Sequence, residues 1–164
     1  EIFLSDISDG MVDEVRNKLG SNFNCIVANA EKIPFKDAYF DTIIANHVLF
    51  YLNDLNLGLK EIDRVLRPNG IFYCSTYGKE HMKEITEIVQ NFDSRINLSN
   101  HSLYDIFGLE NGEEILKHYF SNVERMDYED HLEITESKPL IDYIMSCHGN
   151  QNEILGPRLA EFKE

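Results

Sequence analysis

The chain has 164 residues, of which 43% are hydrophobic, enough apolar material for one globular domain with a buried core. Its 29 acidic residues outnumber 15 basic ones and give a formal net charge of −14, which argues against nucleic acid and anionic membrane surfaces as partners. No apolar run approaches the roughly 18 residues that a membrane span needs.

Short apolar runs alternate with amphipathic segments in the first half of the chain. We predict strands at Ile2–Leu4, Cys25–Ala28, Asp41–Ala45 and Ile71–Ser75. We predict helices from Ser8 or Asp9 to Gly20, at Asp54–Leu66 and at Lys79–Phe92. A turn at Arg67–Gly70 precedes the fourth strand.

The second half is less regular. A capping-box pattern at Ser102–Asp105 opens a short helix. Further helices are predicted at Glu113–Tyr119, from Pro139 to Gly149, and near Glu153–Lys163, and Val123–Ile134 is predicted to be extended. The alternation of strands and helices predicts an α/β fold with a mostly parallel sheet. Because the strands are apolar on both faces, we expect helices on both faces of the sheet.

Ligands of open α/β sheets bind outside the carboxyl ends of the strands, which directs attention to the residues after the first two predicted strands. Asp6 can accept hydrogen bonds from both hydroxyls of a ribose, and Ile7 can cover one face of a base. An ordinary helix-capping role for Asp6 is the alternative. After the second strand, the short side chains and backbone of Asn29–Glu31 can bind the amine and a ring nitrogen of a base, or form an ordinary loop.

The third and fourth predicted strands are followed by polar and aromatic residues. Asn46 and His47 directly follow the third predicted strand, at the expected opening of the site. There His47 is a candidate general base or a positioning residue. Tyr51 is a candidate for the wall of a substrate pocket or for core packing. Thr76 and Tyr77 lie on the same rim and are candidate substrate contacts, or residues of a loop entering the next helix.

Three segments together resemble class I S-adenosylmethionine-dependent methyltransferases. Asp6, Ser8 and Met11 match the D-x-S-x-x-M pattern after a strand. The segment Ala28–Phe35, followed by Phe40–Asp41, is similar to the family's G-D-A-E-E-L-P-F…F-D stretch, and Arg64–Gly70 is similar to its R-V-L-R-P-G-G turn. The resemblance covers about residues 2–80, and the remainder is less specifically similar to a bacterial branch of these enzymes.

This resemblance implies a Rossmann-like methyltransferase fold with S-adenosyl-L-methionine as cofactor. It implies cofactor contacts at Asp6, Ile7, Asn29, Ala30, Glu31, Asn46 and His47. In the family pattern Asp6 holds the ribose, Ile7 packs on adenine, and Asn46 and His47 lie beside the methionine part and the sulfonium. Asn29 stands where the family has Asp, which predicts weakened adenine binding. Asn69 replaces a glycine in a turn that asparagine tolerates.

The chain departs from the family by what it lacks. Its nine glycines are nowhere two positions apart, so the family's GxGxG loop is missing. The alignment predicts an incomplete fold that lacks the first and last family strands. Because such a sheet leaves strand edges unpaired, we expect a rearranged sheet or a homodimer through exposed edges, and a fragment that is inactive alone.

We treat residues 1–164 as one methyltransferase domain, with a cofactor-side half at 1–80 and an acceptor-side half at 81–164. The segment Asn97–Leu116 is a candidate cap. Its Tyr104 and Phe107, with nearby Tyr119, either line an apolar pocket or pack in the core. The acceptor is expected to be a small molecule.

Three scattered cysteines without a C-x-x-C pair favour a reducing, cytoplasmic location and predict no metal site. Glu129–His131 is interpreted as a solvated turn. Two other functions remain open: a non-catalytic truncated domain that only binds or assembles, which the missing glycine loop favours, and a nicotinamide-dependent dehydrogenase, against which the stretch Ile33–Asp41 weighs.

Overall fold

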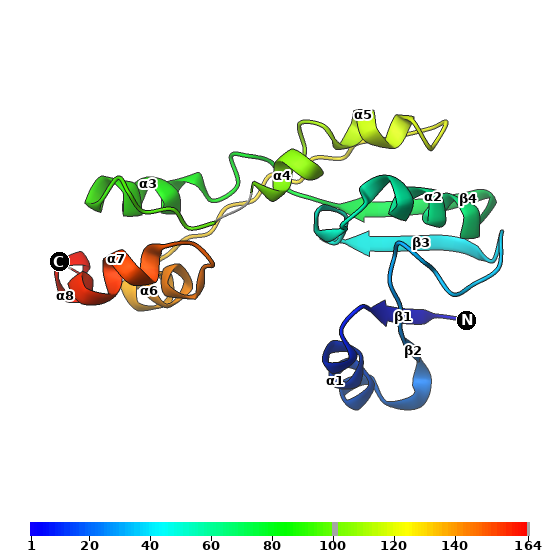
Figure 1. The fold of residues 1–164 in the computed structure, drawn as a ribbon, viewed down its shortest axis with the longest axis horizontal. Coiled ribbons are helices and arrows are strands. Elements are labelled where there is room, and N and C mark those ends of the chain that lie inside the picture. The colour runs from blue at the N-terminus through cyan, green and yellow to red at the C-terminus, as the bar shows by residue number, and fades with distance from the viewer. Residues whose placement is uncertain (100–101, 164) are drawn as a thin grey trace.

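The computed structural model describes residues 1–99 and 102–163, except the side chain at position 21. Parallel strands alternate with helices, which confirms the α/β class (Figure 1). The strands are β1 Phe3–Asp6, β2 Asn24–Val27, β3 Phe40–Asn46 and β4 Leu66–Ser75. The helices are α1 Asp9–Leu19, α2 Leu55–Val65, α3 Lys83–Phe92, α4 Leu103–Ile106, α5 Gly112–Lys117, α6 Ser137–Ser146, α7 Gln151–Leu155 and α8 Leu159–Phe162. Short 3₁₀ turns lie at Gly20–Asn22, Leu49–Tyr51 and Gly156–Arg158.

The four strands form two separate parallel pairs. β1 pairs with β2, β3 pairs with β4, and no ladder joins the two pairs within the described residues. β1, β3 and β4 point the same way in Figure 1, so the carboxyl ends of both pairs lie on one side. The expected rearranged sheet, in which the remaining strands close up, is therefore not formed by the described residues. Among the residues that the structure describes, β1 and β3 each have one edge without a strand partner, and the homodimer remains a prediction.

Four aromatic rings join the two strand pairs at the amino ends of β1 and β3. The ring of Phe3 lies 4.8 Å from that of Phe35 and 5.8 Å from that of Phe40, measured between centroids. Tyr39 packs against Phe35 and Phe40, both at 4.9 Å. These edge-to-face and tilted contacts hold the pairs together where hydrogen bonds do not.

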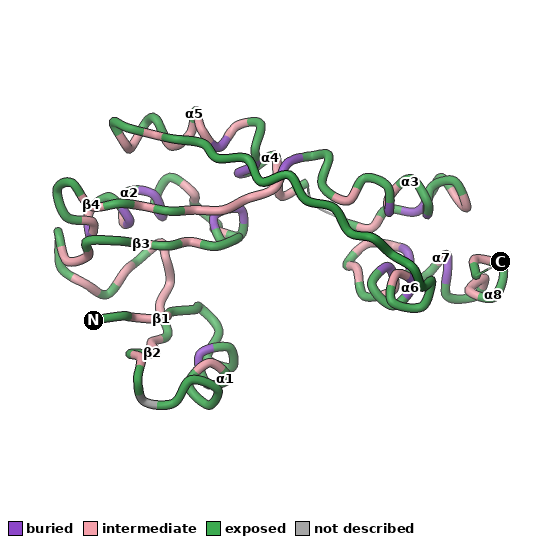
Figure 2. The backbone as a smooth tube through the Cα atoms, turned by 180° about the vertical axis from the view of Figure 1, so that it is seen from behind, coloured by how far each residue is buried: buried purple, intermediate pink, exposed green. Residues whose placement is uncertain are grey.

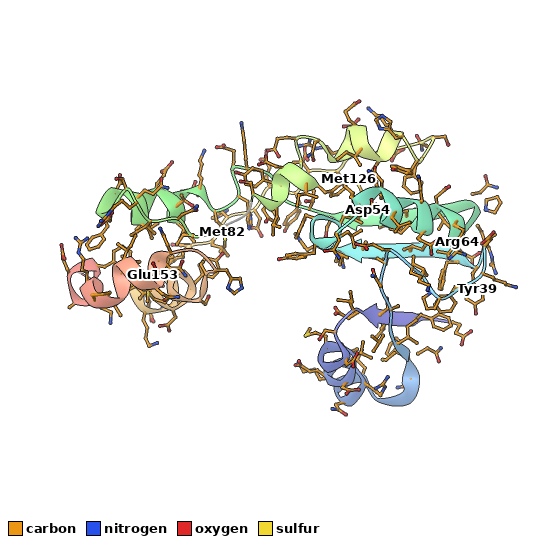
Figure 3. The ribbon with its side chains drawn as sticks, in the orientation of Figure 1. Tyr39, Asp54, Arg64, Met82, Met126 and Glu153 are labelled. Carbon is orange, nitrogen blue, oxygen red and sulfur yellow. The ribbon has the colours of Figure 1, made fainter. Side chains whose placement is uncertain are left out.

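Local signals set the ends of the first two helices. Ser8 caps α1 by accepting a hydrogen bond from the Met11 N–H at 3.4 Å, and Gly20 ends it with a φ of 68°. Asp54 caps α2 by accepting from the Leu57 N–H at 3.0 Å. Figure 3 shows Asp54 and Arg64 at the two ends of this helix.

The predicted turn at Arg67–Gly70 is an interruption inside β4. The ladder pairs Phe40 with Leu66 and then Thr42 with Ile71, so the residues between bulge out of register. Asn69 adopts a φ of 66°, a left-handed conformation that asparagine tolerates better than most residues. The left-handed backbone agrees with the expectation that this turn tolerates asparagine, and the replacement of a family glycine stays a prediction.

Helix α2 covers one face of β3–β4. Its Leu59 and Ile62 are buried in a core cluster with Leu49, Phe50 and Phe107. The side chains of Ile43, Ala45, Phe72 and Cys74 pack on this cluster. The alternate strand positions carry exposed Ile44, Ile71 and Tyr73. Helices on both faces were expected, but within the described residues this pair is covered on one face only.

A second cluster belongs to a separate helical part. Ile85 and Val89 of α3 pack with Ile96, with Ile144 of α6 and with Leu155 of α7. Figure 2 shows buried positions in α2 and in these helices, whereas the connection between α5 and α6 is exposed throughout residues 124–136. The two clusters share no residue.

Several predicted boundaries are wrong in the second half. Helix α3 begins at Lys83 rather than Lys79, because Met82 takes the left-handed conformation with a φ of 54°. The last predicted helix is broken at Gly156–Arg158 into α7 and α8, where Pro157 follows a glycine. The segment Val123–Ile134 is non-helical, as predicted, but it pairs with no strand among the described residues.

Candidate functional site

The carboxyl end of β1 presents Asp6 at an exposed rim. One carboxylate oxygen accepts a hydrogen bond from the Ser8 N–H at 2.8 Å, and the Asp6 carbonyl accepts from the Ala28 N–H at 3.0 Å. Ile7, the next residue, is 66% exposed. The hydrogen bond from Ser8 orients the Asp6 carboxylate. The second carboxylate oxygen of Asp6 and the Ile7 side chain face solvent beside the end of β2.

The loop after β2 is built around Asn29. Its side-chain oxygen accepts from the Glu31 N–H at 2.8 Å, and its carbonyl accepts from the Lys32 N–H at 2.9 Å. The Glu31 carboxylate accepts from the backbone N–H groups of Asn53 at 2.6 Å and Asp54 at 3.1 Å. The predicted base-binding loop is therefore anchored by hydrogen bonds to the start of α2, and these bonds occupy the Glu31 carboxylate.

Asn46 and His47 lie at the carboxyl end of β3, beside the end of β4. The His47 N–H donates to the carbonyl and to the hydroxyl of Ser75, both at 3.2 Å, and that hydroxyl lies 3.5 Å from the Asn46 side-chain oxygen. His47 has a φ of 50°. A non-glycine residue in this conformation carries backbone strain, which often accompanies functional sites.

Five rings gather at this end of the sheet, and we call them the aromatic cluster: His47, Phe50, Tyr51, Tyr77 and His81. Tyr77 is central, with ring centroids 6.3 Å from His47, 5.2 Å from Phe50 and 5.0 Å from His81. Tyr51 stands edge-on to Phe50 at 4.7 Å and is 68% exposed. Burial raises the pKa of Tyr77, so its hydroxyl stays protonated at neutral pH.

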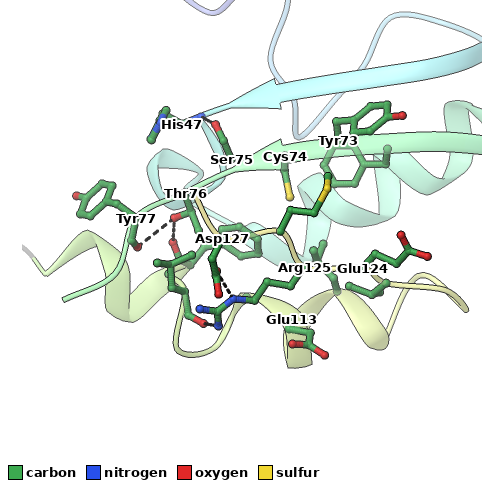
Figure 4. Close-up of a pocket in the computed structure, with 18 of the residues that line it drawn as sticks. His47, Tyr73, Cys74, Ser75, Thr76, Tyr77, Glu113, Glu124, Arg125 and Asp127 are labelled. Atoms are coloured by element: carbon green, nitrogen blue, oxygen red, sulfur yellow. Dashed lines mark hydrogen bonds and ion pairs between the residues drawn. The ribbon is translucent and has the colours of Figure 1, made fainter. Parts of the chain in front are cut away.

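Thr76 follows the carboxyl end of β4, near the aromatic cluster. Its hydroxyl donates a hydrogen bond to the Phe107 carbonyl at 2.7 Å (Figure 4). The Leu109 N–H donates to the Tyr77 carbonyl at 3.3 Å. These bonds anchor the end of β4 to the segment after α4, so Thr76 has a structural partner in addition to its place near the site.

The aromatic residues in and near the candidate cap do not all have the same environment. Phe107 is 1% exposed and belongs to the core, which decides for packing at that position. Tyr119 donates its hydroxyl to the Asn56 side-chain oxygen at 2.8 Å. Positions 100 and 101 of the predicted cap lie outside the described residues.

Sequence reasoning missed His81. It lies in the turn before α3, where no spacing pattern singles it out, and only the fold brings its ring to Tyr77.

Residues 1–74 match the methyltransferase domain family Methyltransf_11. This match places residues 1–74 in the methyltransferase domain family, in agreement with the expected class I S-adenosylmethionine-dependent type. It is 34% identical over 86 residues to the zebrafish protein named mitochondrial arginine-hydroxylase NDUFAF5, covering 51% of this chain and 26% of that protein. It is 33% identical over 101 residues to the ubiquinone/menaquinone biosynthesis C-methyltransferase UbiE of Pectobacterium atrosepticum, covering 58% of this chain and 40% of UbiE.

Among solved structures, a Galdieria sulphuraria protein assigned as a sarcosine dimethylglycine methyltransferase matches with a TM-score of 0.50 and 19% identity, over 72% of this chain and 44% of that one. At this identity the likeness shows the fold alone. The chain thus spans well under two thirds of the length of these curated relatives.

The residues at the carboxyl ends of β1 and β2 fit the nucleoside half of S-adenosylmethionine. The Asp6 carboxylate is exposed and pre-oriented by Ser8, and exposed Ile7 adjoins it. Asn29 uses one side-chain oxygen lone pair within its own loop, which leaves one for an adenine amine. For the methionine half, the described chain places Asn46 and His47 on the second strand pair, with no strand between them and β1.

A trough of about 2390 Å³ runs between β4, α5 and the segment 121–134, with His47, Tyr77 and His81 at one end. This volume is more than twice the roughly 300–1,000 Å³ of small-molecule pockets, so the trough as a whole does not define an acceptor site. Within the described ranges, no helix could cross a membrane and no group of three or more His, Cys, Asp or Glu side chains is placed to hold a metal ion.

Proposed function

We propose that this chain is the nucleoside-binding portion of an enzyme that transfers a methyl group from S-adenosyl-L-methionine to a small-molecule acceptor. The placement of Asp6 and Ile7 beside Asn29 at one rim of the sheet carries the proposal. A carboxylate for a ribose, an apolar cover and an amide for a base form the binding set of an adenine nucleoside.

When bound, the cofactor supplies an electrophilic methyl group on a sulfonium. Methyl transfer needs an aligned nucleophile and dry walls more than acid–base chemistry. Asn46 ends β3 and His47 follows it, where they can orient the acceptor, and the His47 imidazole can take the acceptor's proton. Tyr51 and Tyr77 both pack on Phe50 of the aromatic cluster and supply apolar surface, and Thr76 precedes Tyr77 in the chain.

The relatives support this chemistry and also define an alternative. UbiE is named as a C-methyltransferase of quinone biosynthesis, which favours a small organic acceptor. The zebrafish relative is named an arginine hydroxylase, so a shared fold does not by itself fix the reaction. Hydroxylation, in place of methyl transfer, is therefore the second candidate reaction.

We further propose that the chain acts in the cytoplasm, binds neither nucleic acid nor membranes, and is inactive by itself. A charge of −14 supports the exclusion of both partners. The free edges of β1 and β3 support a homodimer. Sedimentation at rising concentration tests the dimer, and a mass that stays monomeric would contradict it.

Titration calorimetry with S-adenosylhomocysteine tests the nucleoside site. We expect weak binding that Asp6→Asn reduces about tenfold, because the neutral amide loses the charged acceptor for ribose hydroxyls. The matched control, Asp9→Asn, removes a carboxylate three positions away in the first turn of α1 and should leave affinity unchanged.

Three other outcomes would contradict parts of this proposal. Equal loss in both variants would show that Asp6 acts only through general charge. Tight binding would show that the glycine-rich loop is dispensable and that the chain is not a deficient fragment. Binding of a nicotinamide cofactor in place of S-adenosylhomocysteine would favour the dehydrogenase alternative.

A further inference from the structure

Asparagine directly precedes glycine at two places in the chain, at Asn69–Gly70 in β4 and at Asn111–Gly112 at the start of α5. The two pairs have the same local sequence but opposite surroundings. We propose that Asn69 is a site of spontaneous covalent modification, in which its side-chain amide becomes a carboxylate, whereas the fold protects Asn111. This inference does not rest on the proposed function, because the reaction needs neither cofactor nor acceptor.

The reaction uses the atoms of the pair and water. The backbone nitrogen of Gly70, after losing its proton to solvent, attacks the side-chain carbonyl carbon of Asn69. The new C–N bond closes a succinimide ring, and the side-chain nitrogen takes a proton from solvent and leaves as ammonia. Water then opens the ring at either carbonyl, which gives aspartate or isoaspartate and an additional negative charge. Glycine favours ring closure because it has no Cβ and few restrictions on its backbone.

The bulge in β4 favours this reactive pair for structural reasons. Asn69 has a φ of 66°, which asparagine tolerates better than most residues. A Cβ on Gly70 would lie 2.9 Å from the Arg67 carbonyl oxygen, which is too close for a side chain, so glycine fits there without a shift. The turn thus selects an asparagine followed by a glycine through its own geometry.

The Asn69 side chain is free to turn toward the Gly70 nitrogen. Asn69 is exposed, and its side chain has no hydrogen bond to any residue that the structure describes. The strand ladder passes from Leu66 directly to Ile71, so neither residue of the pair has a partner in β3. Because the bulge is already out of register, the extra backbone atom of isoaspartate need not displace the ladder that follows.

The pair Asn111–Gly112 is held in the opposite state. The Asn111 side-chain oxygen accepts from the Gly108 N–H at 2.7 Å, and its amide donates to the Asp105 carbonyl at 2.8 Å. The attacking nitrogen is also engaged, since the N–H of buried Gly112 donates to the Gly108 carbonyl at 2.8 Å. Attack at Asn111 requires these hydrogen bonds to open first, which should slow the reaction by roughly tenfold to a hundredfold.

Peptide mapping by mass spectrometry measures both sites in one sample of the full chain, aged in mildly alkaline buffer. The mass gain for exchange of an amide for an acid should accumulate at least about tenfold faster at Asn69 than at Asn111. In urea both pairs lose their surroundings, so the two rates should converge. The variant Asn69→Gly keeps a residue that tolerates the left-handed turn. It should abolish the fast site and leave the rate at Asn111 unchanged.

Two results would overturn the proposal. Equal rates at the two sites in buffer would show that the bulge protects Asn69 as well as the start of α5 protects Asn111. A difference in rate that persists unchanged in urea would show that the flanking sequence, and not the fold, selects the site.

Discussion

Arg64 shows at the residue scale how one side chain organises the loop before β3. It donates to the carbonyls of Ile33 at 3.0 Å and Phe35 at 2.9 Å, and pairs with Glu61 at 2.7 Å and Asp37 at 2.8 Å. We expect Arg64→Ala to lower the free energy of unfolding by about 2–3 kcal/mol in urea titrations, because partly buried carbonyls and a carboxylate lose their donor.

Arg67→Ala is the matched control. Arg67 makes one exposed ion pair with Asp41, so its loss should cost at most about 1 kcal/mol. The Arg64 hydrogen bond also lowers the pKa of Glu61 below its ordinary 4.5. In the wild type, the contribution of this pair to the free energy of unfolding is present above pH 4.5 and is lost as Glu61 protonates in acid. The Arg64→Ala variant should not show this loss. Equal costs for the two alanine variants would contradict the assignment.

Cys74 gives a second residue-scale prediction. Burial raises the pKa of its thiol from 9.0 to about 11. Since only the thiolate reacts, about one thiol in a thousand is reactive at pH 8 in the folded chain, and unfolding should accelerate alkylation about a hundredfold. Mass mapping of iodoacetamide adducts at Cys74, with and without urea, measures this. Equal rates in both conditions would show that Cys74 is not buried.

At the element scale, β4 tolerates its interruption because of Asn69. A φ of 66° costs little for glycine but strains a residue with a Cβ that cannot hydrogen-bond locally. Asn69→Gly should leave stability unchanged or slightly raised, and Asn69→Ala should lower it by about 1 kcal/mol, as measured by thermal unfolding. If both variants had the same melting temperature, the left-handed conformation would not be what position 69 requires.

At the scale of the whole molecule, the two separate core clusters predict separate loss of structure. Ile144→Ala removes a fully buried side chain from the helical cluster and should cost about 2–5 kcal/mol. Hydrogen exchange should then rise in residues 83–99 and 137–162 but not in β3 or α2. Ile62→Ala is the counterpart in the sheet cluster and should show the reverse pattern. Exchange that rises throughout the chain in both variants would instead support the expectation of one cooperative domain.

Local chemistry allowed the sequence by itself to determine the α/β class and the ends of the first helices. Ser8, Gly20 and Asp54 act on backbone groups a few residues away, and strand ends point to Asp6, Asn29 and His47 because parallel strands finish on one side. Contacts between distant segments were decided only by the tertiary structure. They include the Glu31 bond to the backbone 22 residues on and the 31-residue link from Thr76 to Phe107.

The tertiary structure also decided how the four strands meet. Hydrophobic periodicity predicts a strand, but not which edge stays unpaired, because that depends on which neighbour reaches the edge. No short sequence pattern encodes the path of the chain between distant segments. That path decides the separation of β1 from β3, the uncovered face with Ile44 and the approach of His81 to Tyr77. The sequence singled out Asp6, Ile7 and Glu31 for the proposed nucleoside site, and the tertiary structure decided that Asp6 and Ile7 are exposed whereas Glu31 bonds to the backbone before α2.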